Sequence, residues 1–144
     1  TATWQSVIAL PTQTSNSGKV LTTDGTSASW TNNPTLTNPA WTVQTLTYAA
    51  TTNWNMDLGA SASVTLTGNT TIAAPTNLKA GASYVLKVTQ DATGSRTITW
   101  ASGTFQWPAA TTPVLSTAAN ASDLIFFFCY DGTHLVGSYL RGIA

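Results

Sequence analysis

The feature that most constrains the fold is the segment 124–130, which reads LIFFFCY and stands directly before an Asp-Gly pair. Side chains alternate between the two faces of a β-strand, so a strand with one face in water should alternate apolar and polar residues. This strand is apolar on both faces. One face carries Leu124, Phe126, Phe128 and Tyr130, and the other carries Ile125, Phe127 and Cys129.

One of these faces can fill a core, and the other must be covered by further segments of the chain or by another subunit. Few elements remain in a domain of this size to form a third layer. We therefore favour a second subunit as the cover. The candidate subunit-contact residues are Ile125, Phe127 and Cys129.

The rest of the chain shows short alternating stretches between turn residues and no apolar repeat of helical period. Residues 83–90 place Tyr84, Leu86 and Val88 on one face, with Val85 as an apolar exception on the polar face. Three hairpins are predicted: 83–100 around a turn at 91–95, 122–140 around Asp131-Gly132, and 19–30 around Asp24-Gly25. Threonine, a β-branched residue, is abundant throughout.

These patterns predict an all-β chain in two parts. Residues 41–144 are expected to form an antiparallel, jelly-roll-like β-sandwich, because turn signals recur at the spacing typical of sandwiches. Residues 1–40 are expected to form an extended attachment arm with a short β-hairpin. Two Asn-Pro steps within residues 31–40 favour extended or turn backbone and predict a linker between the two parts.

Composition excludes several classes of function. Five basic and five acidic residues give a formal net charge of zero, so no basic surface favours nucleic acid or a membrane. One histidine, one cysteine and dispersed aspartates match no metal-site spacing, and neither a metal nor a cofactor is expected. The single cysteine cannot form a disulfide within the chain.

Candidate catalytic residues fit structural roles better than chemical ones. The stretch with Gly18 and Lys19 lacks the following helix that a phosphate-binding loop needs. His134 lies just after a predicted turn, where an exposed structural residue is the more economical interpretation. Glutamate is absent, and the aspartates fall beside turns or strand starts, so glycoside hydrolysis is disfavoured. The chain is not expected to be an enzyme.

Passive carbohydrate binding remains open, because exposed aromatic rings stack on sugar rings. The candidate glycan-stacking residues are Trp54, Trp107 and Tyr139. The alternative for each tryptophan is a place in the core or in a subunit contact.

The quoted motifs also carry a resemblance. GKVLTTDGTSASW resembles short N-terminal repeats in virion proteins of tailed bacteriophages, and the second half resembles a β-sandwich domain at the ends of phage fibres and in decoration proteins. The similarity covers residues 11–30 and 45–144. The matching positions are Gly81, Gly94, Trp100, Phe105, Trp107, Pro108, Pro113, Asp123, Asp131, Gly132 and Gly137. The resemblance implies a homotrimer at the virion surface with no cofactor and no chemistry.

Two assignments follow from this resemblance. A chain this short has no room for a long shaft, and a start at Thr1 is consistent with a complete product after methionine removal, so we favour a capsid decoration or head-fibre subunit. The alternative is a tail-fibre adhesin that recognises host glycan; a glycan-cleaving enzyme is less favoured. Attachment to the capsid or to a neighbouring subunit is assigned to main-chain pairing and apolar anchors in the N-terminal segment, and it should resist high salt. These anchors are Trp4, Val7, Ile8 and Leu10.

Overall fold

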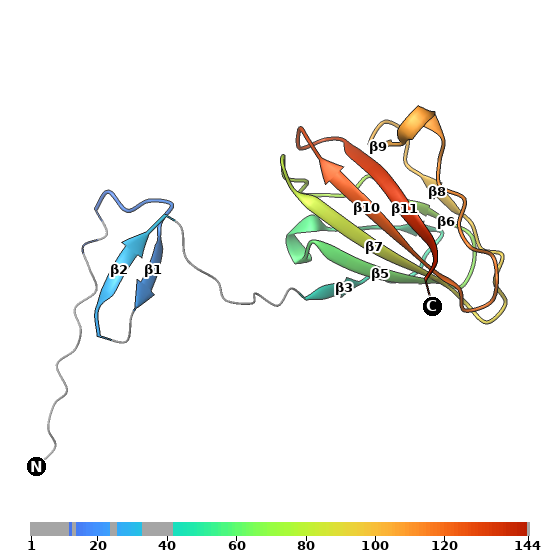
Figure 1. Ribbon diagram of the computed structural model, residues 1–144, viewed down its shortest axis with the longest axis horizontal. Helices are drawn as coiled ribbons and strands as arrows, with labels where there is room; N and C mark the ends of the chain where they lie inside the picture. The colour runs from blue at the N-terminus through green and yellow to red at the C-terminus, as the bar shows by residue number, and fades with distance from the viewer. Residues whose placement is uncertain (1–11, 13, 24–25, 33–41, 144) are drawn as a thin grey trace, which may run out of the picture. The chain divides into compact units, whose positions relative to one another are not determined.

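The computed structural model describes residues 12, 14–23, 26–32 and 42–143. Its contacts divide the chain into two compact units, Thr1–Ala40 and Trp41–Ala144 (Figure 1). The described residues form β-strands and two single-turn 3₁₀ segments, η1 (Met56–Leu58) and η2 (Pro108–Ala110), with no α-helix among them. The all-β prediction is confirmed.

The first unit contains the predicted N-terminal hairpin. Strands β1 (Val20–Thr23) and β2 (Ala28–Thr31) pair antiparallel, with Leu21 opposite Trp30. Before β1, the Lys19 backbone N–H donates to the carbonyl of Asn16, and Lys19 Nζ donates to Asn16 Oδ1 at 2.9 Å. Both Lys19 bonds close a turn with Asn16. This local role agrees with the structural rather than phosphate-binding interpretation of the segment around Gly18 and Lys19. The Asp24-Gly25 turn lies outside the described residues.

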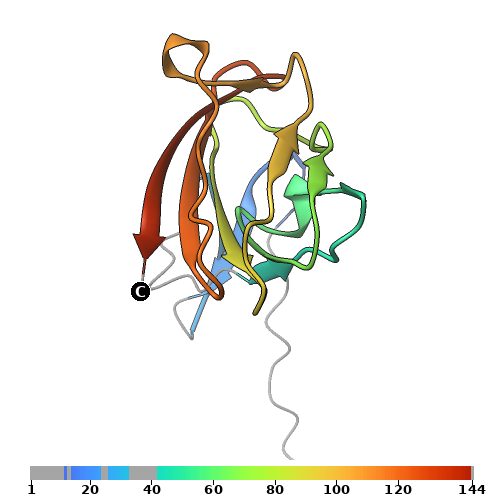
Figure 2. The ribbon, with the colours of Figure 1, turned by 90° about the vertical axis from the view of Figure 1, so that its right-hand side faces the viewer.

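The second unit is built from two sheets. The large sheet has the order β3-β5-β7-β10-β11-β9, and the small sheet has the order β4-β6-β8. The large-sheet strands are β3 (Val43–Thr45), β5 (Ser61–Leu66), β7 (Ser83–Gln90), β9 (Phe105–Gln106), β10 (Ser122–Cys129) and β11 (Leu135–Ile143). The small-sheet strands are β4 (Thr51–Thr52), β6 (Thr70–Ile72) and β8 (Ile98–Trp100). Figure 2 shows β10 and β11 on one side of the unit and β6 and β8 on the other.

From β3 to β8 the chain passes alternately through the large and the small sheet. It thereby makes three coils, which we define as β3–β4, β5–β6 and β7–β8. Successive coils pair in parallel: β3 with β5 and β5 with β7 in one sheet, β4 with β6 and β6 with β8 in the other. A jelly roll is antiparallel throughout. The prediction of an antiparallel, jelly-roll-like sandwich is therefore corrected to a large sheet of mixed pairing and a small parallel sheet.

The predicted hairpin over residues 83–100 is also wrong, because β7 and β8 lie in different sheets. The reason is that both edges of β7 are occupied, one by β5 and the other by β10. At the end of β7 the buried side chain of Gln90 binds the chain that leaves it: its Oε1 accepts from the Arg96 N–H at 2.8 Å, and its Nε2 donates to the Arg96 carbonyl at 2.9 Å. These bonds satisfy backbone groups of Arg96 where the chain crosses to the small sheet.

The C-terminal hairpin is confirmed. β10 and β11 pair antiparallel, and β10 also pairs antiparallel with β7. In the connecting turn Asp131 Oδ1 accepts from the backbone N–H groups of Thr133 and His134 at 2.8 and 2.7 Å. Gly132 has φ of 87°, a left-handed backbone that glycine adopts without a steric penalty.

The core of the second unit lies between its two sheets. Along β7 the buried positions alternate as predicted, with Tyr84, Leu86 and Val88 facing inward. Beside them on the same face of the sheet are Ile125 and Phe127 of β10, whose register partners are Leu86 and Tyr84. Burial of each such side chain stabilises the fold by about 1.5–3 kcal/mol.

One buried carboxylate ties the end of this core together. Asp123 on β10 is 1% exposed and accepts three hydrogen bonds. Ser116 donates from its backbone N and its Oγ, each at 2.7 Å, and the Gly142 N–H donates at 2.8 Å. Asp123 therefore holds the loop before β10 and the end of β11 against each other.

Candidate interaction surfaces

The structure places the predicted subunit-contact residues inside the core. Ile125, Phe127 and Cys129 have exposed fractions of 0%, 3% and 0% within the single chain. Their side chains lie between the two sheets and have no surface left to offer a partner. Their assignment to subunit contact is corrected: they form the face of β10 that fills the core.

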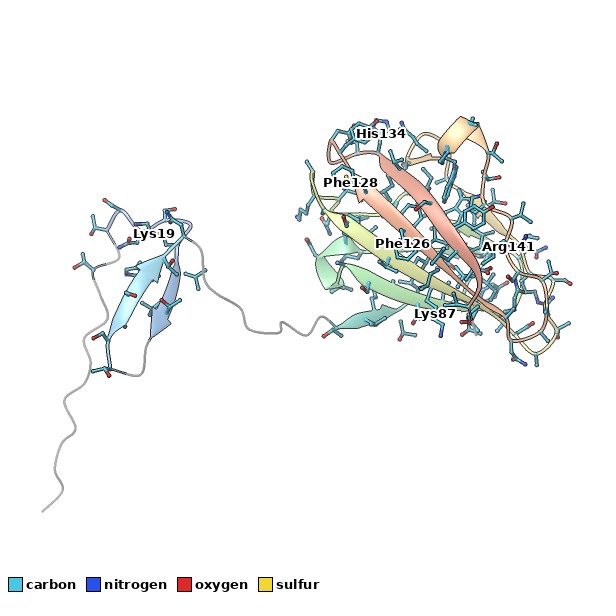
Figure 3. All side chains as sticks on the ribbon, in the orientation of Figure 1. Lys19, Lys87, Phe126, Phe128, His134 and Arg141 are labelled. Carbon is cyan, nitrogen blue, oxygen red and sulfur yellow. The ribbon has the colours of Figure 1, made fainter. Side chains whose placement is uncertain are left out.

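The opposite face of β10 is the open one. Phe126 and Phe128 are 38% and 47% exposed and follow each other along the strand (Figure 3). The register extends the apolar surface sideways, because Phe126 lies opposite Val85 of β7 and Phe128 lies opposite Val136 of β11. We call this surface the outer patch. It consists of Val85, Leu124, Phe126, Phe128, Val136 and Leu140.

The outer patch is continuous across three strands and has a shallow hollow of about 250 Å³ at Val85, Phe126, Phe128 and Val136. Lys87 borders the outer patch on this face of the sheet, where it lies opposite Leu124. Two sequence signals pointed to this surface: the apolar residues on both faces of the segment 124–130, and Val85, the apolar residue on the otherwise polar face of its strand. Its register with Phe126 reveals which side of β10 is open.

Trp54 is not available for glycan stacking. Its side chain is 1% exposed and packs edge-to-face against Tyr84 and Phe127, with ring centroids 6.2 and 6.0 Å apart. Burial removes both ring faces from solvent, so this assignment is corrected to a core role.

Trp107 and Tyr139, the other two candidates, line one pocket of about 350 Å³ together with Pro108. Trp107 is half-buried beneath β11, where Gly137 makes room for it: a Cβ on Gly137 would lie 2.3 Å from a Trp107 ring carbon. Tyr139 is 39% exposed. The structure thus brings these two residues together at the edge between β11 and η2.

Trp107 also lines a neighbouring hollow of about 590 Å³ with Trp100 and Phe105. The ring centroids of Trp100 and Trp107 are 5.2 Å apart in an edge-to-face arrangement. Trp100 was not among the candidate glycan-stacking residues. It ends β8, and Phe105 begins β9 five residues later. The rim of this hollow carries Ser102, Gln106 and Thr112 and no charged residue.

His134 and Asp131 form an ion pair at the tip of the β10–β11 hairpin, through His134 Nδ1 and Asp131 Oδ2. The His134 ring also stacks on Tyr130, with centroids 5.8 Å apart and planes 7° from parallel. Partial desolvation would raise the pKa of Asp131, but hydrogen bonds from the His134 ring and the Thr133 and His134 backbone amides outweigh it and lower that pKa. The pair organises the turn.

The other described aspartates are also engaged in structural contacts. Asp57 pairs with Lys79 at 3.1 Å, and Asp91 pairs with Arg96 at 2.9 Å. The Arg96 side-chain hydrogen bond lowers the pKa of Asp91, against a smaller opposing effect of desolvation. Within the described ranges, no three His, Cys, Asp or Glu side chains are grouped to hold a metal ion.

The candidate attachment residues Trp4, Val7, Ile8 and Leu10 lie outside the described residues, as does most of the predicted Asn-Pro linker. No helix in the described part of the chain has the length and apolarity to cross a bilayer.

Comparison with known proteins decides the family. A family model described as "Putative phage tail fibre C-terminal domain" matches residues 10–134, most of the chain. The chain belongs to this phage tail-fibre family. Searches of curated proteins and of solved structures gave no match.

Membership of the phage tail-fibre family confirms the resemblance to virion surface proteins of tailed bacteriophages. The protein is a phage structural fibre protein, associated with the virion and with other phage tail proteins. In this family member, the second unit has two candidate interaction surfaces. They are the outer patch and the Trp107–Tyr139 pocket.

Proposed function

We propose that this protein is a non-enzymatic subunit of a homotrimeric phage tail fibre and that its outer patch forms the contact between subunits. The observation that carries the proposal is the outer patch itself. Six apolar side chains from three adjacent strands lie together on one sheet face, and four of them, Phe126, Phe128, Val136 and Leu140, are exposed. Contiguous apolar surfaces of this kind mark protein contacts, whereas isolated exposed apolar residues are ordinary.

The chemistry around the outer patch suits burial between copies of the chain. Lys87 borders it, where its ammonium group can stay in water while its alkyl stem covers apolar surface. Burial of a phenylalanine ring contributes about 1.5–3 kcal/mol, so Phe126 and Phe128 from three subunits would supply much of the association energy. The trimeric state itself follows from the resemblance to phage fibres.

Two further observations support the rest of the proposal. The family description favours the tail over the capsid as the site of attachment. The carboxylates of Asp57, Asp91, Asp123 and Asp131 all serve structural contacts, so none of these four stands ready as a catalytic acid or nucleophile.

The experiment is a measurement of oligomeric mass by light scattering or sedimentation. The intact chain should be a trimer, and the double variant Phe126→Ser/Phe128→Ser should be a folded monomer. The control removes two apolar side chains outside the patch that are more exposed than these phenylalanines, Leu58→Ser/Val114→Ser, and should remain trimeric. A monomeric wild type, or a trimeric patch variant, would refute the assembly.

Gold-labelled antibody against the chain, viewed on intact particles, tests the location. Label at the tail supports the fibre assignment. Label over the head would instead restore the capsid-decoration assignment, and absence of label from accessible particles would remove the virion-surface role.

We retain residues 1–40 as the attachment segment, anchored by Trp4, Val7, Ile8 and Leu10. Because these residues are uncharged, attachment should persist in concentrated salt, where ionic contacts are screened. Release of folded protein from particles washed with concentrated salt would contradict this role.

A second candidate function, recognition of host glycan, is favoured by one observation. Trp107 and Tyr139 share a pocket, although they are far apart in the sequence. On a glycan array, Tyr139→Ala should lose binding, whereas Tyr130→Ala, at the hairpin tip, should keep it. Equal binding by both variants would exclude this pocket.

A further inference from the structure

The C-terminal half of strand β11 has an edge without a partner strand. On one side β11 pairs with β10 along its whole length, whereas on the other side β9 pairs only with Leu135 and Val136. Figure 2 shows no other strand of the second unit beside the lower half of β11, on the side away from β10. The regular strand ends at Gly142, where φ is 62° and the N–H bonds to Asp123. We call residues 137–141 the free edge; the backbone groups of such an edge are a template for pairing with another chain.

Hydrogen bonds elsewhere on β10 and β11 establish which backbone groups point to the free edge. The Leu135 N–H donates to the carbonyl of Thr104, on the β9 side, at 2.8 Å. Cys129, which lies opposite Leu135 on β10, has its N–H and its carbonyl bonded on the β7 side. Alternate residues of a strand direct their backbone groups to the same edge, so the N–H and carbonyl of Tyr139 also point away from β10. At Tyr139 no described strand pairs with β11 on that side.

The pocket of Trp107 and Tyr139 lies beside the free edge. Residues 137–139 line one side of it, and Trp107, Pro108 and Thr111 line the other. Side chains directly opposite each other on paired strands share a face of the sheet. A residue added opposite Tyr139 would therefore direct its side chain to the pocket side, where no lining residue is charged. The pocket favours an apolar side chain at that position.

Arg141 provides a charge next to this pocket. It follows Tyr139 by two positions, its side chain is exposed, and its Nη2 donates to the Leu115 carbonyl at 3.3 Å (Figure 3). No carboxylate of the described residues forms an ion pair with it. A guanidinium group binds a carboxylate through a fork of two hydrogen bonds. A carboxylate on an incoming strand, two residues from the apolar side chain, would lie on the same face and across from Arg141.

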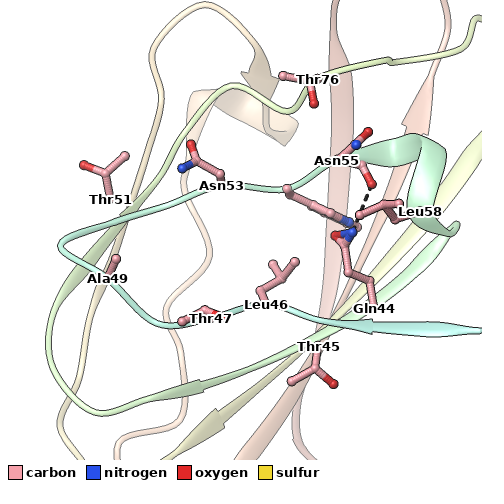
Figure 4. A pocket seen from close by; sticks show the side chains of 11 residues that line it. Gln44, Thr45, Leu46, Thr47, Ala49, Thr51, Asn53, Asn55, Leu58 and Thr76 are labelled. Atoms are coloured by element: carbon pink, nitrogen blue, oxygen red, sulfur yellow. Dashed lines mark hydrogen bonds between the residues drawn. The ribbon is translucent and has the colours of Figure 1, made fainter.

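The opposite edge of the large sheet, strand β3, is a poorer acceptor. β3 has three residues, and short edge strands resist pairing with another chain. The pocket beside it, about 420 Å³ between residues 44–49 and 51–55, is crossed by the Gln44 side chain, whose Nε2 donates to the Asn55 carbonyl at 3.2 Å (Figure 4). The free edge of β11 thus combines backbone groups with a pocket that no such side chain crosses.

We propose that the free edge binds an extended segment of another phage tail protein, which adds a strand to the large sheet. Main-chain hydrogen bonds to Tyr139 hold the segment, an apolar side chain fills the pocket, and an acidic side chain two positions away pairs with Arg141. Strand addition takes its affinity from main-chain bonds and its specificity from pockets for alternate side chains. Another copy of this chain is not the partner, because an acidic residue stands two positions from an apolar one only at Asp123 and Asp131, within and directly after β10.

This binding is separate from the subunit contact, because the outer patch lies on the opposite face of β11. The probes are two short capped peptides of threonines that carry one phenylalanine and, two positions after or before it, one aspartate. The two orders serve the two directions of an added strand. In proton–nitrogen correlation spectra of the full ¹⁵N-labelled chain, one of the peptides should shift the amide signals of Gly137 and Tyr139 in saturable fashion and leave those of β3 unchanged.

Two substitutions at Tyr139 isolate the main-chain bond. Tyr139→Ala removes the ring and keeps the N–H, whereas Tyr139→Pro removes both, and proline is tolerated on an edge strand whose N–H faces outward. The proline variant should bind the peptide about tenfold more weakly than the alanine variant, the effect of one lost hydrogen bond. A glycan in the same pocket would not distinguish the two variants.

Arg141→Gln tests the charge pair and leaves the backbone unchanged, so its result stands even if Tyr139→Pro folds poorly. It should weaken binding of the aspartate peptide about threefold, the effect of an exposed ion pair. It should not change binding of a peptide in which asparagine replaces the aspartate. The control Lys87→Gln, on the opposite face of the sheet, should bind both peptides as the wild type does.

A photo-reactive amino acid in place of Thr111, at the wall of the pocket, identifies the partner on intact particles. Crosslinks to a segment of a different tail protein that has an apolar and an acidic residue two positions apart support the proposal. Crosslinks confined to other copies of this chain, or no crosslinks, would overturn it. So would the absence of peptide-induced shifts at the free edge, equal binding by the two Tyr139 variants, or an aspartate peptide that Arg141→Gln does not weaken.

Discussion

Gly137 should not tolerate a side chain, because the ring of Trp107 lies directly against it. A Cβ at this position would lie 2.3, 2.7 and 2.8 Å from three ring carbons of Trp107, whereas ordinary van der Waals contacts begin near 3.4 Å. Trp107 cannot easily move, because its ring is packed against Trp100 and Phe127 at centroid distances of 5.2 and 5.7 Å. Gly137 does not have a left-handed backbone, so the cost of Gly137→Ala should be entirely steric.

We expect Gly137→Ala to lower the free energy of unfolding by about 2–3 kcal/mol, the upper part of the range for overpacked cores. For a unit of this size, that loss corresponds to a Tm lower by roughly 10–20 °C. Urea titration and calorimetry measure both quantities. Ser138→Ala, at the adjacent exposed position, should change stability by less than about 0.5 kcal/mol.

A double-mutant cycle isolates the contact. In a Trp107→Leu background the ring is gone, so Gly137→Ala should cost little and the two substitutions should couple strongly. If Gly137→Ala leaves stability unchanged, or costs the same with and without the Trp107 ring, the steric explanation is wrong.

Three further outcomes are expected. Asp123→Asn should lower the unfolding free energy by about 1–3 kcal/mol, because an amide cannot accept all the bonds from Ser116 and Gly142 that the carboxylate accepts; an unchanged urea midpoint would contradict this. The pKa values of Asp91 and Asp131 are lowered from 3.8. The two carboxylates should therefore stabilise the fold fully above that pH, and this stabilisation should be lost as the pH falls below it. Replacing both by asparagine should flatten the acid limb of a plot of unfolding free energy against pH. Gly94→Ala should cost about 2–4 kcal/mol by calorimetry, because φ is +74° and the new Cβ would lie 2.4 Å from a backbone oxygen; a neutral effect would show that the loop relaxes.

Local features of the fold could be predicted from the sequence. The alternation in residues 83–90 marked the buried face of β7, and Asp131-Gly132 marked the C-terminal hairpin. Each of these signals lies within a few residues of the structure it predicts. In the hairpin the turn chemistry is sufficient because β11 follows β10 directly along the chain. In β7 the alternation shows which face is buried, but not which strands pair with it.

Strand pairing over longer distances could not be predicted in this way. The parallel register of β5 with β7 pairs residues 24 positions apart. Nothing local distinguishes a strand that returns to its neighbour from one that crosses to another sheet. After β7 the chain crosses to the other sheet because β5 and β10 already occupy both edges of β7. The alternation within residues 83–90 does not reveal these two partners, which lie elsewhere in the sequence.

The same limit applies to the candidate surfaces. The two-faced pattern of β10 was recognised, but the choice between its faces depends on register with β7, which places Ile125 opposite Leu86 and Phe126 opposite Val85. Whether Trp54 is exposed depends on how the three coils pack around it. Trp107 and Tyr139 were identified by residue type, but their common pocket is a product of the fold.

The stack of three coils also has a mechanical consequence. A load that arrives along the chain from the first unit reaches the second unit at β3, an edge strand of three residues whose one neighbour is β5. Because each coil is joined mainly to the next, such a load would peel the coils apart in sequence rather than shear the whole sheet at once. At the other end, the nine-residue strand β11 is held by β10 and by the Asp123–Gly142 hydrogen bond. The two ends of this unit therefore differ in strength as points of attachment. The weaker end, β3, is the one joined to the first unit.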